Sequence, residues 1–160
     1  MLIKEIPVSE TYELRHAVLR PGFPRNTVHY EQDRLEGAFH LGVFEGDILI
    51  CIGSFYKMAH MDPSVAAKIQ THFTEFDPFQ TDKIYQLRGM ATLSEYRSKG
   101  AGSLLLTSAK NILKAKGVSL LWCNAREIAF PFYRNLGFIE VGDFFNSYTI
   151  PHKVMFKRIS

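Results

Sequence analysis

The sequence predicts a mixed α/β fold in which helices cover the faces of one mixed sheet, within a single domain that spans residues 1–160. Three observations predict it. Strand-like and helix-like segments alternate in the order β-α-β-β-β-α-β-α-β-β. Two apolar runs are joined by a short turn, as in a β-hairpin, and one nearly continuous apolar run is typical of a strand buried on both faces. A chain of this length suits one domain with a sizeable core.

The N-terminal segments start this alternation. Residues 1–6 have the composition of a short strand, and a helix is expected over 9–19 because its apolar residues repeat at helical spacing. Ser9 is a suitable N-cap for this helix, and Pro21–Gly22 ends it.

A hairpin and a long connection follow. Residues 38–44 and 48–56 are apolar, strand-like runs, and the turn Glu45–Gly46–Asp47 between them predicts an antiparallel hairpin. Residues 57–81 form a longer connection with a helix near 64–75. Three phenylalanines suggest that this connection packs over another part of the protein: Phe73, Phe76 and Phe79.

The second half completes the sheet with four strands and two helices. Gly117 and Gly137 follow the two helices directly, in the position that glycine favours at a helix C-terminus. The run VSLLWC at 118–123 is the strand expected to be buried on both faces. The predicted strands are 83–92, 118–123, 138–144 and 152–158, and the predicted helices are 101–116 and 127–136.

Composition excludes several function classes. The net charge is only +3 and the Lys and Arg residues are scattered, which disfavours nucleic-acid binding. The N-terminus lacks the apolar core and cleavage site of a secretory signal, and no apolar run approaches about 18 residues. We therefore expect a cytoplasmic protein without membrane association, in which Cys51 and Cys123 are buried free thiols.

The segment YRSKGAGSLLL at 96–106 joins a predicted strand to a predicted helix. The first N–H groups of a helix have no partners within it, and the helix dipole there favours an anion. Gly100 and Gly102 remove side chains that would keep a phosphate from these groups, and Arg97 and Lys99 add positive charge. A tight turn that needs glycine for its backbone angles explains the glycines equally well. The spacing is neither that of a P-loop nor, with Leu105 in the third glycine position, that of a dinucleotide fingerprint.

Two motifs resemble those of one known family. The segment 86-QLRGMATLSEYRSKGAGSLLL-106 resembles motif A of the GNAT superfamily of N-acetyltransferases, in which a Q/R-x-x-G-x-G/A turn holds the pyrophosphate of coenzyme A. Downstream, 124-NAREIAFPFYRNLGF-138 is similar to motif B of that family. The resemblance extends over nearly the whole chain and implies the GNAT fold, with a mixed, mostly antiparallel central sheet and helices on both faces.

By this resemblance, the cofactor is acetyl-CoA, used as a co-substrate. The strand of motif A would bind the pantetheine amides through Met90, Ala91 and Thr92, and the Met90 N–H would polarise the thioester carbonyl. A preorganised donor of this kind contributes typically about 3 kcal/mol to transition-state stabilisation. The loop that would hold the pyrophosphate comprises Arg97, Ser98, Lys99, Gly100, Ala101, Gly102 and Ser103.

Motif B supplies a candidate acid. Tyr133 occupies the position of the family's tyrosine, whose hydroxyl points at the sulfur of the coenzyme. A phenol with a pKa near ~10 stays protonated at neutral pH and can protonate the leaving thiolate; the alternative is that Tyr133 only packs a short helix on the core. Asn124 either binds the pantetheine arm or caps the helix that follows it.

The general base and the acceptor contacts are less defined. The predicted strand at 83–92 carries no carboxylate, which leaves Glu127, His152 and His40 as candidate bases, or a water chain. His40 is also a candidate for substrate binding, as is Arg88, whose guanidinium suits an acidic group on the acceptor. The segment 57–81 and the early helix are the expected walls of the acceptor site.

The sequence therefore predicts an N-acetyltransferase that moves an acetyl group from acetyl-CoA directly to an amine of a small molecule or peptide, in a ternary complex. The alternative is a non-catalytic module that binds or senses acyl-CoA. The histidines and cysteines show no metal-ligand spacing, so no metal is expected. The acceptor's identity and the oligomeric state, a homodimer included, stay open.

Overall fold

The protein is described by a computed structural model over residues 1–58 and 61–159. The chain forms two compact units, and each unit is built from two separate stretches of the sequence. The first unit comprises Met1–Tyr56 and Leu87–Ile112, and the second comprises Lys57–Gln86 and Leu113–Ser160.

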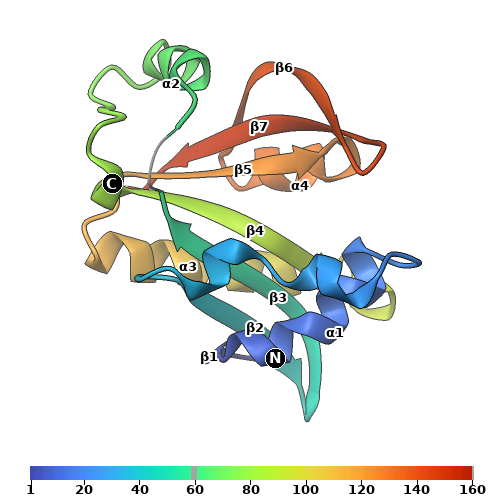
Figure 1. Ribbon diagram of the computed structural model, residues 1–160. Coiled ribbons are helices and arrows are strands. Elements are labelled where there is room, and N and C mark those ends of the chain that lie inside the picture. The colour runs from blue at the N-terminus through green and yellow to red at the C-terminus, as the bar shows by residue number, and fades with distance from the viewer. Residues whose placement is uncertain (59–60, 160) are drawn as a thin grey trace. The chain divides into compact units, whose positions relative to one another are not determined.

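The strands of the first unit are β1 (Leu2–Ile6), β2 (Phe39–Glu45), β3 (Ile48–Lys57) and most of β4 (Ile84–Thr92). They lie side by side in the order β1-β2-β3-β4 (Figure 1). β1 pairs antiparallel with β2, and β2 pairs antiparallel with β3. The predicted hairpin is therefore confirmed.

The predicted helix over 9–19 is three short pieces. A 3₁₀ turn covers Val8–Thr11, α1 covers Tyr12–Leu14, and a π-helical turn covers Arg15–Leu19. The expectation that Ser9 caps the helix is wrong, because Ser9 lies inside the 3₁₀ turn and Pro7 precedes that turn. Pro7 holds the extended backbone (φ −66°, ψ 154°) from which the chain enters the turn, and no side chain caps it.

Helices lie on both faces of the first unit's sheet. On one face, Leu14 of α1 packs with Ile52 of β3 and Ala91 of β4. On the other, α3 (Ala101–Ala115) comes so close that a Cβ at Gly53 would lie 2.9 Å from Leu105 Cδ2. Because it has no side chain, Gly53 allows the helix to approach the sheet closely.

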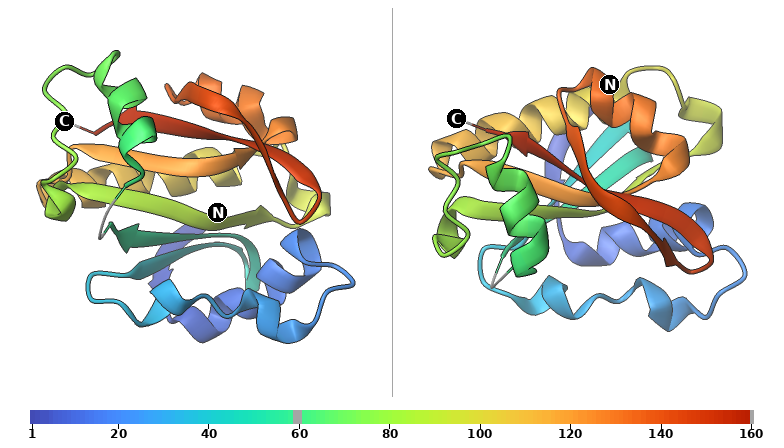
Figure 2. Two further views of the ribbon diagram at one scale, coloured as in Figure 1. Left: turned by 45° about the horizontal axis from the view of Figure 1, so that its top comes forward. Right: turned by 90° about the horizontal axis from the view of Figure 1, so that it is seen from above.

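The strands of the second unit pair antiparallel in the order β5-β7-β6. Its strands are β5 (Leu120–Arg126), β6 (Ile139–Ser147) and β7 (Ile150–Arg158), and its helices are α2 (Pro63–Gln70) and α4 (Phe130–Asn135). Figure 2 shows α2 beside the curved ribbon of β6 and β7. The core under α2 is built from alternate strand residues together with the helix and the loop after it: Ala66, Ile69, Phe73, Leu120, Trp122, Val154 and Phe156.

The long connection is partly as predicted. α2 starts at Pro63 behind Asp62, whose carboxylate accepts from Ser64 N at 2.8 Å, and it ends earlier than expected. Phe73 and Phe76 are buried as expected, but Phe79 is 89% exposed. Phe79 follows Asp77–Pro78 in a turn that points it away from the core, so the expectation that all three phenylalanines pack is wrong for this one.

The predicted glycines at the C-termini of the two helices in the second half of the chain are confirmed. Gly117 after α3 and Gly137 after α4 have φ of 77° and 89°, the left-handed conformation of a helix C-terminus. β5 extends to Arg126, three residues beyond its predicted end, which places Asn124 on the strand. Within residues 1–58 and 61–159, no helix is long and apolar enough to cross a membrane.

Candidate functional site

The loop between β4 and α3 has the backbone shape that the sequence predicts. After a 3₁₀ turn at Ser94–Tyr96, Ser98 and Gly100 adopt positive φ values of 60° and 91°. Successive backbone N–H groups in a turn of this kind can form a concavity that suits anions. Gly100 therefore serves the turn itself, and this turn opens directly into a helix.

The helix start adds donors and charge. The hydrogen-bond ladder of α3 begins with Leu104 N donating to Gly100 O at 3.0 Å, so the preceding N–H groups have no partner inside the helix. Arg97, Ser98 and Lys99 are exposed, and the first turn of α3 carries no acidic residue. The two explanations of the glycines are thus compatible: a tight turn and an anion cradle share these residues.

β4 contains an irregularity that the sequence analysis missed. Gly89 has φ of 62°, and a Cβ there would lie 3.2 Å from Arg15 Nε and 3.3 Å from Tyr30 Cε2. The signal was available, because a glycine inside a strand pattern often marks a bulge or a close approach. Gly89 directly precedes Met90, so it sets the backbone from which the predicted pantetheine-binding groups follow.

The end of β4 is anchored to β3. Thr92 Oγ1 lies 3.2 Å from Cys51 Sγ, and Leu93 N donates to Ile50 O at 2.9 Å. Burial raises the pKa of Cys51 to about 11, so its side chain stays a thiol. Both cysteines are buried and free, as predicted.

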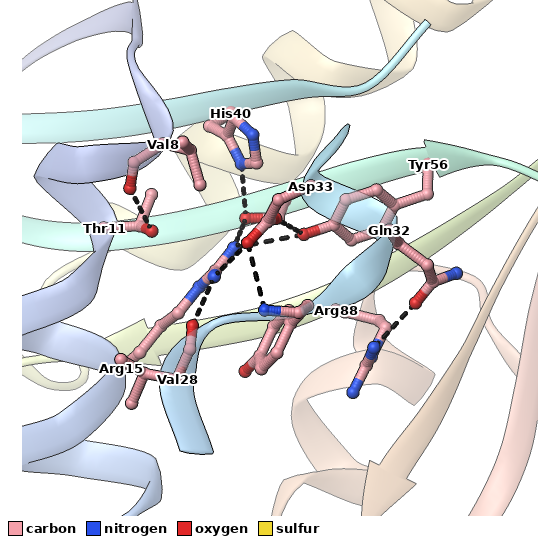
Figure 3. A network of polar contacts seen from close by, with 11 residues as sticks. Val8, Thr11, Arg15, Val28, Gln32, Asp33, His40, Tyr56 and Arg88 are labelled. Carbon is pink, nitrogen blue, oxygen red and sulfur yellow. Dashed lines mark hydrogen bonds and ion pairs between the residues drawn. The ribbon is translucent and has the colours of Figure 1, made fainter. Parts of the chain in front are cut away.

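A buried polar network, also missed by the sequence analysis, stands beside Gly89. Arg15 is fully buried and binds both carboxylate oxygens of Asp33, with Nη1–Oδ2 at 2.9 Å and Nη2–Oδ1 at 3.1 Å (Figure 3). It also donates to Val28 O and Ser54 Oγ, both at 2.8 Å. Tyr56 donates a hydrogen bond to the same carboxylate. The network ties the π-helical turn and the Glu31–Arg34 turn to β3.

The ion pair decides the charge states in this network. Burial alone would raise the pKa of Asp33, but hydrogen bonds from Arg15 and Tyr56 outweigh it and hold that pKa below its usual value. Burial opposes the charge of Arg15 as well, but the hydrogen bond to Asp33 and the electrostatic interactions with Tyr56, Tyr30 and Asp33 together outweigh it, so the pKa of Arg15 is raised. Burial and the neighbouring carboxylate raise the pKa of Tyr56, which therefore keeps its proton.

His40 belongs to this network. It is 6% exposed on β2, and its Nδ1 lies 2.7 Å from Ser54 Oγ (Figure 3). Burial lowers the pKa of His40, so the imidazole is neutral at pH 7. The candidate for substrate binding and base catalysis is thus packed inside the first unit.

Arg88 lies at the edge of the same network. Its guanidinium carbon is 4.1 Å from the centre of the Tyr30 ring, and its Nη1 donates to Gln32 Oε1 at 2.6 Å (Figure 3). The guanidinium of Arg15 lies 4.0 Å from the centre of that same ring. Arg88 is half-buried, in contrast to the fully buried Arg15.

The candidate acid lies in the second unit. Tyr133 of α4 is 6% exposed, and its ring contacts Phe138 edge-on with centroids 5.2 Å apart. Its hydroxyl hydrogen-bonds to Cys123 of β5, whose pKa burial raises to about 12. The ring is therefore packed and its hydroxyl is held against a protonated thiol.

The other predicted residues of this unit lie around the end of β5. The alternative that Asn124 caps the next helix is wrong: it is exposed on β5, and the N-caps that follow are Arg126 and Ala129. Glu127 is exposed in the turn directly after β5. His152 pairs in register with Arg126.

The nitrogens of His152 can be told apart. Nδ1 lies 2.7 Å from Ile150 O, and because a carbonyl only accepts, Nδ1 carries the hydrogen. The ring stacks on Phe145 with centroids 5.6 Å apart. Nε2 is then the nitrogen that can take up a proton. No group of three metal-ligating side chains occurs among the residues that the structure describes.

The predicted site residues thus divide between the units. The loop, Met90 to Thr92, Arg88 and His40 belong to the first unit, whereas Asn124, Glu127, Tyr133 and His152 belong to the second.

Comparisons with known proteins agree with these motifs. The family model described as "Acetyltransferase (GNAT) family" matches residues 8–138. The uncharacterized N-acetyltransferase YitI of Bacillus subtilis (strain 168) is 40% identical over 159 residues, which cover 98% of this chain and 95% of that protein. Among solved structures, an aminoglycoside 6'-N-acetyltransferase complexed with coenzyme A matches with a TM-score of 0.73 and 12% identity, over 100% of this chain and 98% of that one. ElaA of Escherichia coli matches with a TM-score of 0.72 and 16% identity over 98% of both chains. The predicted fold class is confirmed.

Proposed function

The chain belongs to the acetyltransferase (GNAT) family, and on that premise we propose how its own residues divide the work of acetyl transfer. It is an acetyl-CoA-dependent N-acetyltransferase, which moves an acetyl group from acetyl-CoA to an amine. The reaction needs a held donor, a polarised carbonyl, an uncharged amine and a proton for the leaving thiolate.

The loop from Arg97 to Ser103 holds the pyrophosphate of the donor. The observation that supports this is the positive φ at Ser98 and Gly100 directly ahead of an α-helix with no acid in its first turn. N–H groups without partners inside the helix, the helix dipole and two cations then act on the same anion. Met90, Ala91 and Thr92 hold the pantetheine arm through their backbone, with Asn124 as a further contact, and the Met90 N–H polarises the thioester.

Tyr133 and His152 move the protons. The amine nitrogen attacks the thioester carbon directly, the C–S bond breaks, and the Tyr133 hydroxyl gives its proton to the departing thiolate. His152 takes the proton of the amine through Nε2, an assignment favoured by the Nδ1–H bond to Ile150 O. Glu127, exposed one residue beyond Arg126 and its cross-strand partner His152, is the second candidate for this step.

Acceptor contacts come from Arg88, with His40 supporting the Arg15 network behind it. A cytoplasmic location fits two buried free thiols, because reducing compartments keep cysteines unpaired. Scattered positive charge supports no nucleic-acid partner. A homodimer stays a prediction that no residue decides.

Thermal unfolding with ligands tests the donor assignment. A ligand at 100 times its Kd stabilises a protein by about 2.7 kcal/mol, which raises Tm by roughly 5–10 °C for a chain of this length. We expect such a shift with acetyl-CoA and free CoA, because both carry the pyrophosphate and pantetheine that the loop and β4 bind. ATP at the same concentration should give a much smaller shift, since it lacks the pantetheine. Equal shifts with ATP would contradict the role of β4.

A further inference from the structure

Arg88 is a half-buried cation without a carboxylate of its own. It contacts the amide oxygen of Gln32 and the face of the Tyr30 ring, both uncharged groups. Among residues 1–58 and 61–159, no carboxylate lies within ion-pair distance of it. A guanidinium that is partly withdrawn from water is stabilised by an anion, and none is supplied from within the described chain.

The carboxylate of the network, Asp33, already accepts hydrogen bonds from other groups. Asp33 accepts from Arg15 at both oxygens, from Tyr56, and from Tyr30 N at 3.2 Å. These four bonds fill the lone pairs that a carboxylate offers. Arg15 and Arg88 share the Tyr30 ring, yet only Arg15 is neutralised. The positive charge of Arg88, at the edge of the network, is therefore not balanced by Asp33.

The surplus charge stands next to the proposed reaction centre. Arg88 is two residues from Met90 on β4, so the Cα atoms of the two residues lie at most about 7 Å apart. Its Nη1 bonds Gln32, whose amide oxygen and the Tyr30 ring fix the plane of the guanidinium. A planar guanidinium held in this way presents its remaining N–H groups as a pair, the geometry that matches a carboxylate.

We infer that Arg88 binds a carboxylate of the acceptor, so that the acceptor is a small amine that also carries a carboxylate. The inference rests on the proposed function, because it places the amine at the thioester held by Met90. The spacing from Arg88 to Met90 fits an amino acid better than a long polyamine, whose second charge would also be repelled by the guanidinium. The same chemistry would suit an α-amino acid or an ω-amino acid, and the test separates the two.

The test compares each amino acid with its own carboxamide. The four pairs are L-leucine and L-leucinamide, L-lysine and L-lysinamide, β-alanine and β-alaninamide, and 4-aminobutyrate and 4-aminobutanamide. Release of CoA thiol gives the rate, and the product mass identifies the acetylated amine. We expect at least one acid to exceed its amide by tenfold or more in kcat/KM, because a site that pairs a buried polar group discriminates strongly against a ligand lacking the partner.

Variants at Arg88 locate the effect. Arg88→Gln should raise the KM of the accepted acid at least tenfold, leave its amide unchanged and leave the KM of acetyl-CoA unchanged. Arg88→Lys keeps the charge but loses the paired donors. The KM of this variant for the accepted acid should therefore lie between those of the wild type and Arg88→Gln. Arg34→Gln is the matched control, since Arg34 is exposed and lies two residues from Gln32 in the same turn.

Several results would overturn the inference and leave the proposed function standing. Amides that react as well as acids, or an Arg88→Gln variant that slows both equally, exclude a carboxylate at Arg88. A weaker affinity of that variant for acetyl-CoA would assign Arg88 to the donor. Acetyl-CoA binding without turnover of any acid in the panel also counts against it. Failure of acetyl-CoA to bind the wild-type protein would instead refute the proposed function.

Discussion

Replacing Arg15 by alanine should destabilise the protein by about 3–5 kcal/mol, because it leaves the Asp33 carboxylate in a buried site without its partner. The guanidinium also satisfies Val28 O and Ser54 Oγ, which lose their donor in the variant. For a chain of this length, the loss corresponds to a fall in Tm on the order of 10 °C. Urea unfolding at pH 7 measures the difference, with the m-value as a check on the denatured state.

The exposed pair Arg25–Glu13 is the matched control. Its side chains are 65% and 78% exposed, whereas those of Arg15 and Asp33 are 0% and 7% exposed. Exposed pairs contribute at most about 1 kcal/mol, so Arg25→Ala should be nearly silent. Equal losses at the two positions would show that the network does not hold the first unit together.

The pH dependence of the Arg15 effect has a definite sign. The folded state lowers the pKa of Asp33, so its ion pair stabilises the protein fully above the ordinary carboxyl pKa of about 3.9. That contribution is lost as pH falls through the lower, folded value. The difference between wild type and Arg15→Ala should therefore shrink below pH 4.

Replacing Tyr133 by phenylalanine should lower kcat by about 10²–10⁴, the usual range for loss of a general acid. The ring still packs against Phe138, so the affinity for acetyl-CoA should stay within about twofold. Loss of the hydroxyl's hydrogen bond with Cys123 should cost about 1 kcal/mol of stability. Rates of thiol release give kcat, calorimetry gives the Kd of acetyl-CoA, and urea unfolding gives the change in stability.

Tyr148→Phe serves as the control for that experiment, because Tyr148 is 43% exposed in the β6–β7 turn. A kcat that stays near the wild-type value in Tyr133→Phe would return Tyr133 to a packing role. The thiolate would then leave without this acid. A large loss of acetyl-CoA affinity would also contradict the assignment, since it would make the hydroxyl a binding group.

The features that depend only on residues close together in the sequence could be predicted from local sequence signals. The β2–β3 hairpin follows from its turn residues, α3 from its apolar face and Gly117, and the loop at 97–103 from its glycines and cations. Each of these features is encoded within about fifteen consecutive residues. The family resemblance is also carried by two such stretches.

The Arg15 network could not be predicted in this way. Its members come from a π-helical turn, a 3₁₀ turn, β2 and β3, and the hydrogen bond from Arg15 to Tyr56 spans 41 residues in sequence. An arginine in a predicted amphipathic helix is ordinarily solvated, and only the folded chain shows that Arg15 is fully buried. The break of the 9–19 helix has the same origin, because the π-helical turn that carries Arg15 is held by tertiary contacts.

The measurement that tests the account most directly is a calorimetric comparison of acetyl-CoA with S-acetyl-pantetheine, which lacks the pyrophosphate and the nucleotide. It uses the wild type, Arg97→Ala/Lys99→Ala, and Lys114→Ala/Lys116→Ala, which makes the same change of charge at the other end of α3. If the loop at 97–103 holds the pyrophosphate, the first variant should bind acetyl-CoA about 10–100-fold more weakly, as expected for lost charge-assisted hydrogen bonds. Its affinity for S-acetyl-pantetheine should not change, and the second variant should match the wild type. Equal weakening by both double variants, or equal weakening toward both ligands, would contradict the cradle.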